Sequence, residues 1–173
     1  MRELVDKSRI EAFLQALARE ATTDTKVYLV GGTSAVLIGW RQSTVDVDLV
    51  MRPDSDAMLR AIPRLKERLK MNVEIASPDQ FIPVPAGWEE RSPVIARIGR
   101  VTFHHYDFTA QALAKLERGH ARDLADVQAM ATAGLIGGTE VRRQFALVET
   151  QLYRFPAVDP ESFRNAVDAA FPE

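Results

Sequence analysis

The segment VYLVGGTSAVLIGWRQSTVDVDLVM, which runs from Val27 to Met51, constrains the fold of this chain more than any other feature. An apolar run before paired glycines is typical of a buried strand that ends in a tight turn. Alternation of apolar and acidic residues near the end of the segment indicates a second strand. We therefore expect a strand over 26–30, a turn at Gly31-Gly32, a short helix over 33–39 and a strand over 45–51.

Asp46 and Asp48 lie one strand step apart, so their side chains should share one face of a sheet, because strand side chains alternate with period two. The alternating apolar residues of the same strand then line the buried face. Two adjacent carboxylates repel each other unless a cation lies between them. Mg²⁺, which prefers hard oxygen ligands and substrate phosphates, fits such a pair. The second strand therefore predicts a metal site.

The Gly31-Gly32 turn predicts a phosphate site next to it. Glycine lets the backbone approach a triphosphate without a Cβ in the way, and the free N–H groups at the start of the next helix face phosphate oxygens. Thr33 and Ser34 can add hydroxyl donors. The alternative is an ordinary strand-to-helix turn without a ligand.

The rest of the chain predicts a mixed αβ part over residues 1–108 and a helical part over 109–173, packed together as one compact unit. We expect a helix over 9–20 with a Ser8–Glu11 capping box, a helix from Asp54 or Ser55 to Leu69 kinked or split near Ala61 by Pro63, and a short strand over 73–76. An ordered loop over 77–93 should precede a hairpin of strands 94–98 and 100–108. Four helices follow, over 110–118, 121–133, from Thr139 and from Asp159.

Composition limits the classes of function. The 173 residues contain no cysteine, which excludes disulfides, zinc–thiolate sites and thiol nucleophiles. The net charge of −2 gives no sign of a protein coated in positive charge. No apolar run suits a signal peptide or a membrane-spanning helix, so we expect a cytoplasmic protein without a membrane segment.

The order of elements, together with Gly31-Gly32-Thr33 and Asp46-Val47-Asp48, resembles the nucleotidyltransferase superfamily that includes DNA polymerase β. Arg41 and Thr44 complete an Arg-x-x-Thr-x-Asp-x-Asp form that is similar to the minimal, AbiEii-type branch of bacterial toxin–antitoxin and phage-defence systems. The resemblance implies an α+β nucleotidyltransferase fold with a small mixed sheet flanked by helices. Arg41 would contact phosphate, or neutralise the two aspartates when no metal is bound.

A second motif lies in KLERGHARDLADV, where Lys115, Arg122, Asp123 and Asp126 resemble the Lys…Arg-Asp-x-x-Asp helix pair of the same branch. The resemblance implies that Lys115 and Asp123 are catalytic and that Arg122 binds the nucleotide. Asp126 could orient Lys115 or Arg122 through a salt bridge. The alternative is a solvated, charged face of an exposed helix.

The resemblance also implies a third metal-binding carboxylate on a neighbouring strand, and Asp107 at the end of strand 100–108 is the candidate beside Asp46 and Asp48. The alternative is that Asp107 caps the following helix. Catalysis by His104 or His105 is a further possibility, but adjacent histidines in an edge strand are more often structural or exposed.

These observations lead to a Mg²⁺-dependent nucleotidyltransferase (Mn²⁺ could replace Mg²⁺) that transfers a nucleoside monophosphate from an NTP to an acceptor hydroxyl. By resemblance the acceptor is the 3′ end of a tRNA, and the protein is a toxin with a cognate antitoxin. One alternative is an antitoxin that attaches AMP to a partner toxin, and another is a non-catalytic binding module. A basic run over 60–70 could contact RNA or form an ordinary exposed helix face.

Overall fold

The computed structural model describes residues 3–173, and its contacts divide the chain into two compact units. The first unit comprises the described residues up to Ser77 together with Ser92–Tyr106. The second comprises Pro78–Arg91 and Asp107–Glu173. Each unit has its own buried apolar residues, and each is described separately below.

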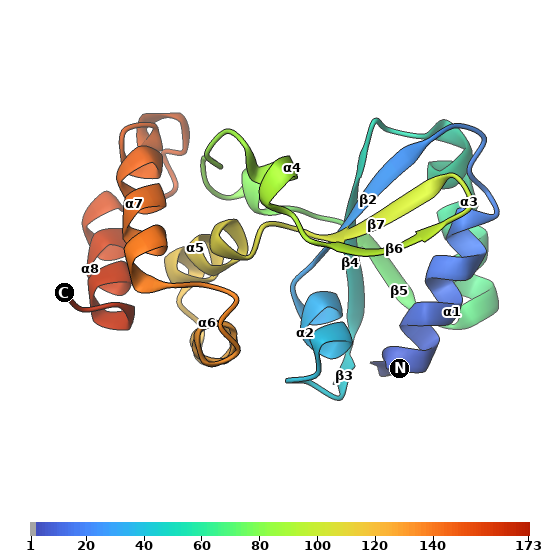
Figure 1. Ribbon diagram of the computed structural model, residues 1–173, viewed down its shortest axis with the longest axis horizontal. Helices are drawn as coiled ribbons and strands as arrows, with labels where there is room; N and C mark the ends of the chain where they lie inside the picture. Colours follow the sequence, from blue (N-terminus) through green and yellow to red (C-terminus); the bar gives the residue numbers. More distant parts are fainter. Residues whose placement is uncertain (1–2) are drawn as a thin grey trace. The chain divides into compact units, whose positions relative to one another are not determined.

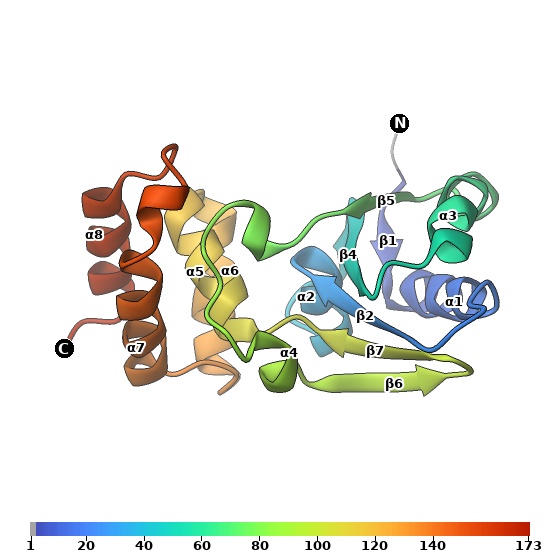
Figure 2. The same cartoon turned by 90° about the horizontal axis from the view of Figure 1, so that it is seen from above.

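The first unit is built on a five-stranded mixed sheet with the strand order β5-β4-β2-β7-β6 (Figures 1 and 2). Its strands are β2 (Thr25–Val30), β4 (Asp46–Arg52), β5 (Asn72–Ile75), β6 (Val94–Ile98) and β7 (Val101–His105). The central strand β2 pairs antiparallel with β4 and parallel with β7. Outside them, β5 pairs parallel with β4, and β6 pairs antiparallel with β7. The predicted hairpin is confirmed, with Gly99 in the left-handed region at its turn.

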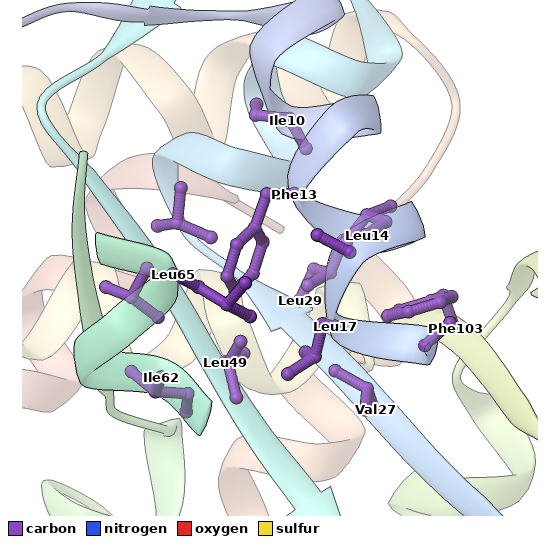
Figure 3. Packing of buried hydrophobic residues seen from close by; sticks show 14 of the residues in the cluster. Ile10, Phe13, Leu14, Leu17, Val27, Leu29, Leu49, Ile62, Leu65 and Phe103 are labelled. Carbon is purple, nitrogen blue, oxygen red and sulfur yellow. The ribbon is translucent and has the colours of Figure 1, made fainter. Parts of the chain in front are cut away.

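Helices α1 (Lys7–Ala18) and α3 (Asp56–Leu69) cover one face of this sheet, because their apolar stripes meet the apolar side chains of the strands. Figure 3 shows Phe13 and Leu17 of α1 and Leu65 of α3 packed together with side chains of β2, β4 and β7. The acidic side chains of β4 alternate with this buried set. They therefore belong to the opposite face of the sheet.

One local prediction about these helices is wrong, and of the kink or split predicted for the second helix the split is excluded. Asp6, rather than Ser8, caps α1, because its side chain accepts a hydrogen bond from Arg9 N (2.9 Å). Asp6 is held extended by a two-stranded sheet in which β1 (Val5–Asp6) pairs with β3 (Ser43–Thr44). Helix α3 is not split near Ala61: Pro63 lies inside one continuous helix, and the predicted cap at Ser55 is confirmed.

The second unit is helical. Its main helices are α5 (Phe108–Arg118), α6 (Ala121–Thr132), α7 (Gly138–Glu149) and α8 (Pro160–Ala170), with the short α4 (Trp88–Arg91) and the 3-10 helices η1 (Pro78–Gln80) and η2 (Leu152–Arg154). Helix α5 packs against α6, α7 and α8. The rings of Phe145 and Phe163 meet at a centroid distance of 4.9 Å between α7 and α8. The predicted loop over 77–93 thus contains two short helical turns.

The predicted class is confirmed: the chain is α+β, with a mixed sheet flanked by helices and a helical C-terminal part. Strand β7 ends at His105, two residues before Asp107, so Asp107 does not lie in the predicted strand. Over residues 3–173 no helix has the length and apolar character needed to cross a bilayer.

Candidate functional site

Asp46 and Asp48 share one face of β4, as predicted. Val47, Leu49 and Met51 alternate with them and are buried on the other face, whereas both aspartates are half-buried. Asp48 pairs in register with Val30, the last residue of β2. The two carboxylates therefore lie beside the end of β2, where the chain enters the glycine turn.

The Gly31-Gly32 turn lies close to these carboxylates and to Arg41. A Cβ on Gly31 would lie 3.6 Å from Asp48 Oδ2, and Gly31 has a φ of +63°. A Cβ on Gly32 would lie 2.4 Å from Thr44 Oγ1 and 3.2 Å from Arg41 Nη1, so no larger residue fits without displacing Thr44. The structure thus brings together four predicted site residues, namely both glycines, Arg41 and Asp48.

Thr33 and Ser34 open helix α2 (Gly32–Ile38), and both are fully buried. Thr33 Oγ1 accepts a hydrogen bond from Asp48 N (3.2 Å), which joins α2 to the carboxylate strand. Ser34 Oγ donates to Leu29 O (3.1 Å) on β2. These hydroxyls therefore fix the position of the turn relative to the strands, and their predicted contact with phosphate remains a prediction.

His105 adds a third connection to this turn. Its Nδ1 lies 2.9 Å from Ser34 Oγ, and because the Ser34 hydroxyl donates its proton to Leu29 O, Nδ1 is the donor. Burial lowers the pKa of His105 to about 4, so the ring is neutral at neutral pH. His105 therefore joins β7 to α2 as an uncharged hydrogen-bonding group.

His104 points to the other face of the sheet, because neighbouring strand residues alternate. It is buried, stacks on Tyr28 at 4.9 Å, and donates from Nδ1 to Ser92 O (3.0 Å). The structural interpretation of both histidines therefore has direct support, but β7 lies between β2 and β6 and is not the expected edge strand.

The sequence interpretation missed Asn72 and Glu74, which lie beside the aspartates. Strand β5 pairs parallel with β4 so that Asn72 is the neighbour of Asp46, and Glu74 is the neighbour of Asp48. Register neighbours point to the same face of a sheet. Asn72 Nδ2 donates to Asp46 Oδ1 (2.6 Å) and to Glu74 Oε1 (2.9 Å). We call Asp46, Asp48, Asn72 and Glu74 the acidic edge.

The acidic edge suits Mg²⁺ in its donor chemistry, because carboxylates are the hard oxygen ligands that this ion prefers. Thr44 and Arg41 pack closely on Gly32, and the guanidinium of Arg41 is the cation at this turn that could contact a phosphate group. In residues 3–173, no three His, Cys, Asp or Glu side chains already form a group that could hold a metal ion. Substrate phosphate oxygens would therefore complete the coordination, as is usual for Mg²⁺ in nucleotide sites.

Asp107 has a different local setting, in the second unit. It is the N-cap of α5 and accepts a hydrogen bond from Thr109 N (3.3 Å), and Arg91 Nε donates to its Oδ2 (3.0 Å). Burial raises the pKa of Asp107, and the charge and hydrogen bond of Arg91 oppose this shift. The capping alternative is thus what the structure shows, and metal binding by Asp107 remains a prediction.

Lys115, Asp123 and Asp126 meet between α5 and α6. Lys115 Nζ lies 2.8 Å from Asp126 Oδ2 and 3.7 Å from Asp123 Oδ1. Arg118 donates to both oxygens of Asp123, at 2.8 and 2.5 Å. We call these four residues the ion-pair cluster. The predicted Lys115–Asp126 bridge is present. The alternative of a solvated helix face is wrong for Lys115, Asp123 and Asp126, because their side chains are buried.

The sequence does not point to Arg118, which lies next to Asp123 and donates to both of its oxygens. Arg122 is exposed on α6. Burial alone would raise the pKa of Asp123, but the hydrogen bonds and charge of Arg118, with Lys115, hold it below its ordinary value. Asp123 is therefore a stable anion inside the helical unit.

The basic run on α3 is partly neutralised. Arg64 Nη2 lies 3.1 Å from Glu20 Oε2, and Arg60 Nη2 lies 3.9 Å from Asp56 Oδ2. All four side chains reach solvent, where such pairs contribute little energy. This pattern favours an ordinary exposed helix face over a dedicated RNA surface.

Comparison with known families assigns the chain to a family. A family model described as "Nucleotidyltransferase of unknown function (DUF6036)" matches residues 8–156, which include both glycines, the acidic edge and the ion-pair cluster. No curated protein and no solved structure matches the chain.

Proposed function

Because the chain belongs to this family of nucleotidyltransferases, we propose that it transfers a nucleoside monophosphate from an NTP to an acceptor hydroxyl with the help of Mg²⁺. One observation carries the proposal. The carboxylates of the acidic edge lie beside a glycine turn in which Gly32 leaves no room for a side chain. Candidate metal ligands thus lie beside a tightly packed glycine turn that carries the guanidinium of Arg41.

In this proposal Asp46 and Asp48 hold the metal, and Glu74 replaces Asp107 as the favoured third carboxylate. The support for Glu74 is its position as the register neighbour of Asp48 and its shared hydrogen-bond donor with Asp46. Asp107 keeps its place as an alternative ligand to be tested by substitution.

The turn binds the triphosphate in this proposal. Backbone N–H groups at the start of α2 face the phosphate oxygens, and Arg41, whose guanidinium lies close to Gly32, adds positive charge. The fully buried Thr33 and Ser34 hold these groups in place. Positioning of this kind supplies much of the catalysis in phosphoryl transfer.

The reaction is a displacement at the α-phosphorus. The acceptor oxygen forms a bond to that phosphorus, the bond to the bridging oxygen of the β-phosphate breaks, and pyrophosphate leaves. The hydroxyl proton passes to a carboxylate of the acidic edge or to solvent. Bound Mg²⁺ would neutralise the phosphates and make the acceptor hydroxyl more acidic.

We further propose, from the likeness of the second motif to the AbiEii-type branch, that Lys115, Asp123 and Arg122 serve the same reaction. Arg122 is the exposed cation of the motif and the natural group to contact an anion. Lys115 and Asp123 hold α5 and α6 together, so they fix the helix that carries Arg122.

The acceptor that this resemblance favours is the 3′ end of a tRNA, which would make the protein a toxin with a partner antitoxin. Transfer of AMP to a protein hydroxyl is the competing outcome. The partly neutralised basic run on α3 offers no support for RNA binding through that helix.

The test incubates the protein with each α-labelled NTP, Mg²⁺ and either total RNA or lysate protein. An Asp46→Ala/Asp48→Ala variant should lose the label, whereas the exposed control pair Asp54→Ala/Glu67→Ala should retain it. Label in RNA supports the tRNA proposal, and label in a protein supports AMP transfer. Labelling by the first variant at the wild-type level, or no labelling at all, would overturn the proposed function.

A further inference from the structure

Asn72 lies between two carboxylates of the acidic edge. Its Nδ2 is 2.6 Å from Asp46 Oδ1 and 2.9 Å from Glu74 Oε1. Carboxylate oxygens only accept, so the amide nitrogen, and not the amide oxygen, must face them. The two hydrogens of one NH₂ group are therefore divided between two acids.

This arrangement is distinct from a salt bridge. Asn72 adds no charge, so both carboxylates keep the negative charge that attracts a cation. It engages only one oxygen of each, Oδ1 of Asp46 and Oε1 of Glu74. Outer groups of this kind orient metal ligands and commonly change metal affinity by about 10- to 100-fold.

Because Asn72 binds one oxygen of each carboxylate, it affects which metal ion the acidic edge can bind. Mg²⁺ is small and demands near-ideal octahedral geometry, whereas Ca²⁺ takes six to eight oxygens and readily binds both oxygens of one carboxylate. A carboxylate with one oxygen bound to Asn72 is poorly suited to offer both. The amide therefore opposes the ligation that Ca²⁺ exploits.

We infer that Asn72 is a positioning residue that makes the acidic edge selective for Mg²⁺ over Ca²⁺ by engaging one oxygen each of Asp46 and Glu74. This inference rests on the metal site of the proposed function.

The test measures metal binding without turnover. Mn²⁺ alone is titrated into the full-length protein by electron paramagnetic resonance, and Mg²⁺ or Ca²⁺ then displaces it. For Asn72→Ala we expect the ratio of the Ca²⁺ Kd to the Mg²⁺ Kd to fall about tenfold. Asn72→Asp keeps the shape but loses both donors, and the ratio should fall at least as far.

The exposed Asn165→Ala on α8 is the matched control and should leave the ratio unchanged. Asn72 is half-buried on an edge strand, so Asn72→Ser provides a second small variant if the alanine variant folds poorly. An unchanged ratio in the Asn72 variants, with Mn²⁺ still bound, would overturn the role of Asn72 alone. If the wild-type protein binds no Mn²⁺, or if Asp46→Asn does not remove that binding, the proposed metal site is overturned, and this inference with it.

Discussion

In the first unit, Asp46 and Glu74 reach solvent and share the neutral amide of Asn72, whereas in the second unit Asp123 and Asp126 are buried and bound by Arg118 and Lys115. Both places gather acidic side chains, but Asn72 is a neutral donor, whereas Arg118 and Lys115 are cations. Buried carboxylates need cations, because an unpaired buried charge costs several kcal/mol. Carboxylates near solvent can retain their charge.

This difference separates two uses of acidic residues that look alike in sequence. An acid pair bound by an amide keeps its attraction for a metal, and an acid pair bound by cations holds helices together. The comparison predicts that substitutions in the acidic edge change activity more than stability. Substitutions in the ion-pair cluster should do the reverse.

The largest effect should come from Asp46→Asn. Loss of a metal-binding carboxylate should reduce nucleotide transfer at least a thousandfold, or about 4 kcal/mol in the barrier. The melting temperature should stay within about 2 °C of the wild-type value, because Asp46 is half-buried and the amide oxygen of an asparagine can still accept from Asn72. Initial rates and thermal unfolding measure both quantities. A variant that unfolds instead of losing activity would show that the acidic edge stabilises the fold.

Lys115→Met tests the other side of the comparison. It leaves the buried Asp126 without its cation, so the free energy of unfolding should fall by about 3 kcal/mol in a urea titration. Adding Asp126→Leu should restore much of the loss, because an apolar pair then replaces the ionic one. If Lys115→Met leaves stability unchanged but abolishes transfer, the lysine is catalytic and the comparison fails.

His105→Asn tests whether the buried ring of His105 stays uncharged in the folded protein. Between pH 6.5 and about 4 the unfolded chain binds a proton on His105 and the folded chain does not, so stability falls as the pH falls. We expect this group to cost the wild type about 2 kcal/mol between pH 7 and pH 4.5. The variant should lose correspondingly less stability over that interval. Equal pH profiles of the unfolding free energy would show that His105 does not titrate this way.

The smallest effect should come from Gly32→Ala. The added Cβ would meet Thr44 Oγ1 at 2.4 Å, so we expect a loss of about 1 to 2 kcal/mol in unfolding free energy. Thr44→Ala in the same chain should relieve part of the loss. Gly137→Ala is the control, because a Cβ there meets nothing within 4 Å. Equal costs at the two glycines would show that the turn tolerates a side chain.

Sequence reasoning located the elements whose signals are local. The apolar run, the paired glycines and the alternation around Asp46 and Asp48 predicted β2, α2 and β4, because turn chemistry and strand period act over a few residues. The cap of α1 depends on a nonlocal contact: the pairing of β1 with β3 holds Asp6 extended, in the geometry of a cap.

The partners of the site residues depended on distant contacts. Asn72 and Glu74 lie beside Asp46 only because of the register in which β5 pairs with β4. The sequence of a four-residue strand does not specify that register. Arg118 of α5 meets Asp123 of α6 through the packing of the two helices that flank Gly119.

The sequence by itself determined that this chain has a strand–turn–helix–strand segment with two aspartates on one face, since those features follow from short-range periodicity and glycine geometry. Only the tertiary structure decided which groups surround the acidic residues. It set a neutral amide beside Asp46, a lysine beside Asp126 and a helix cap at Asp107. The physical reason is that strand register and helix packing bring together residues far apart in the chain, and no local propensity encodes those pairings.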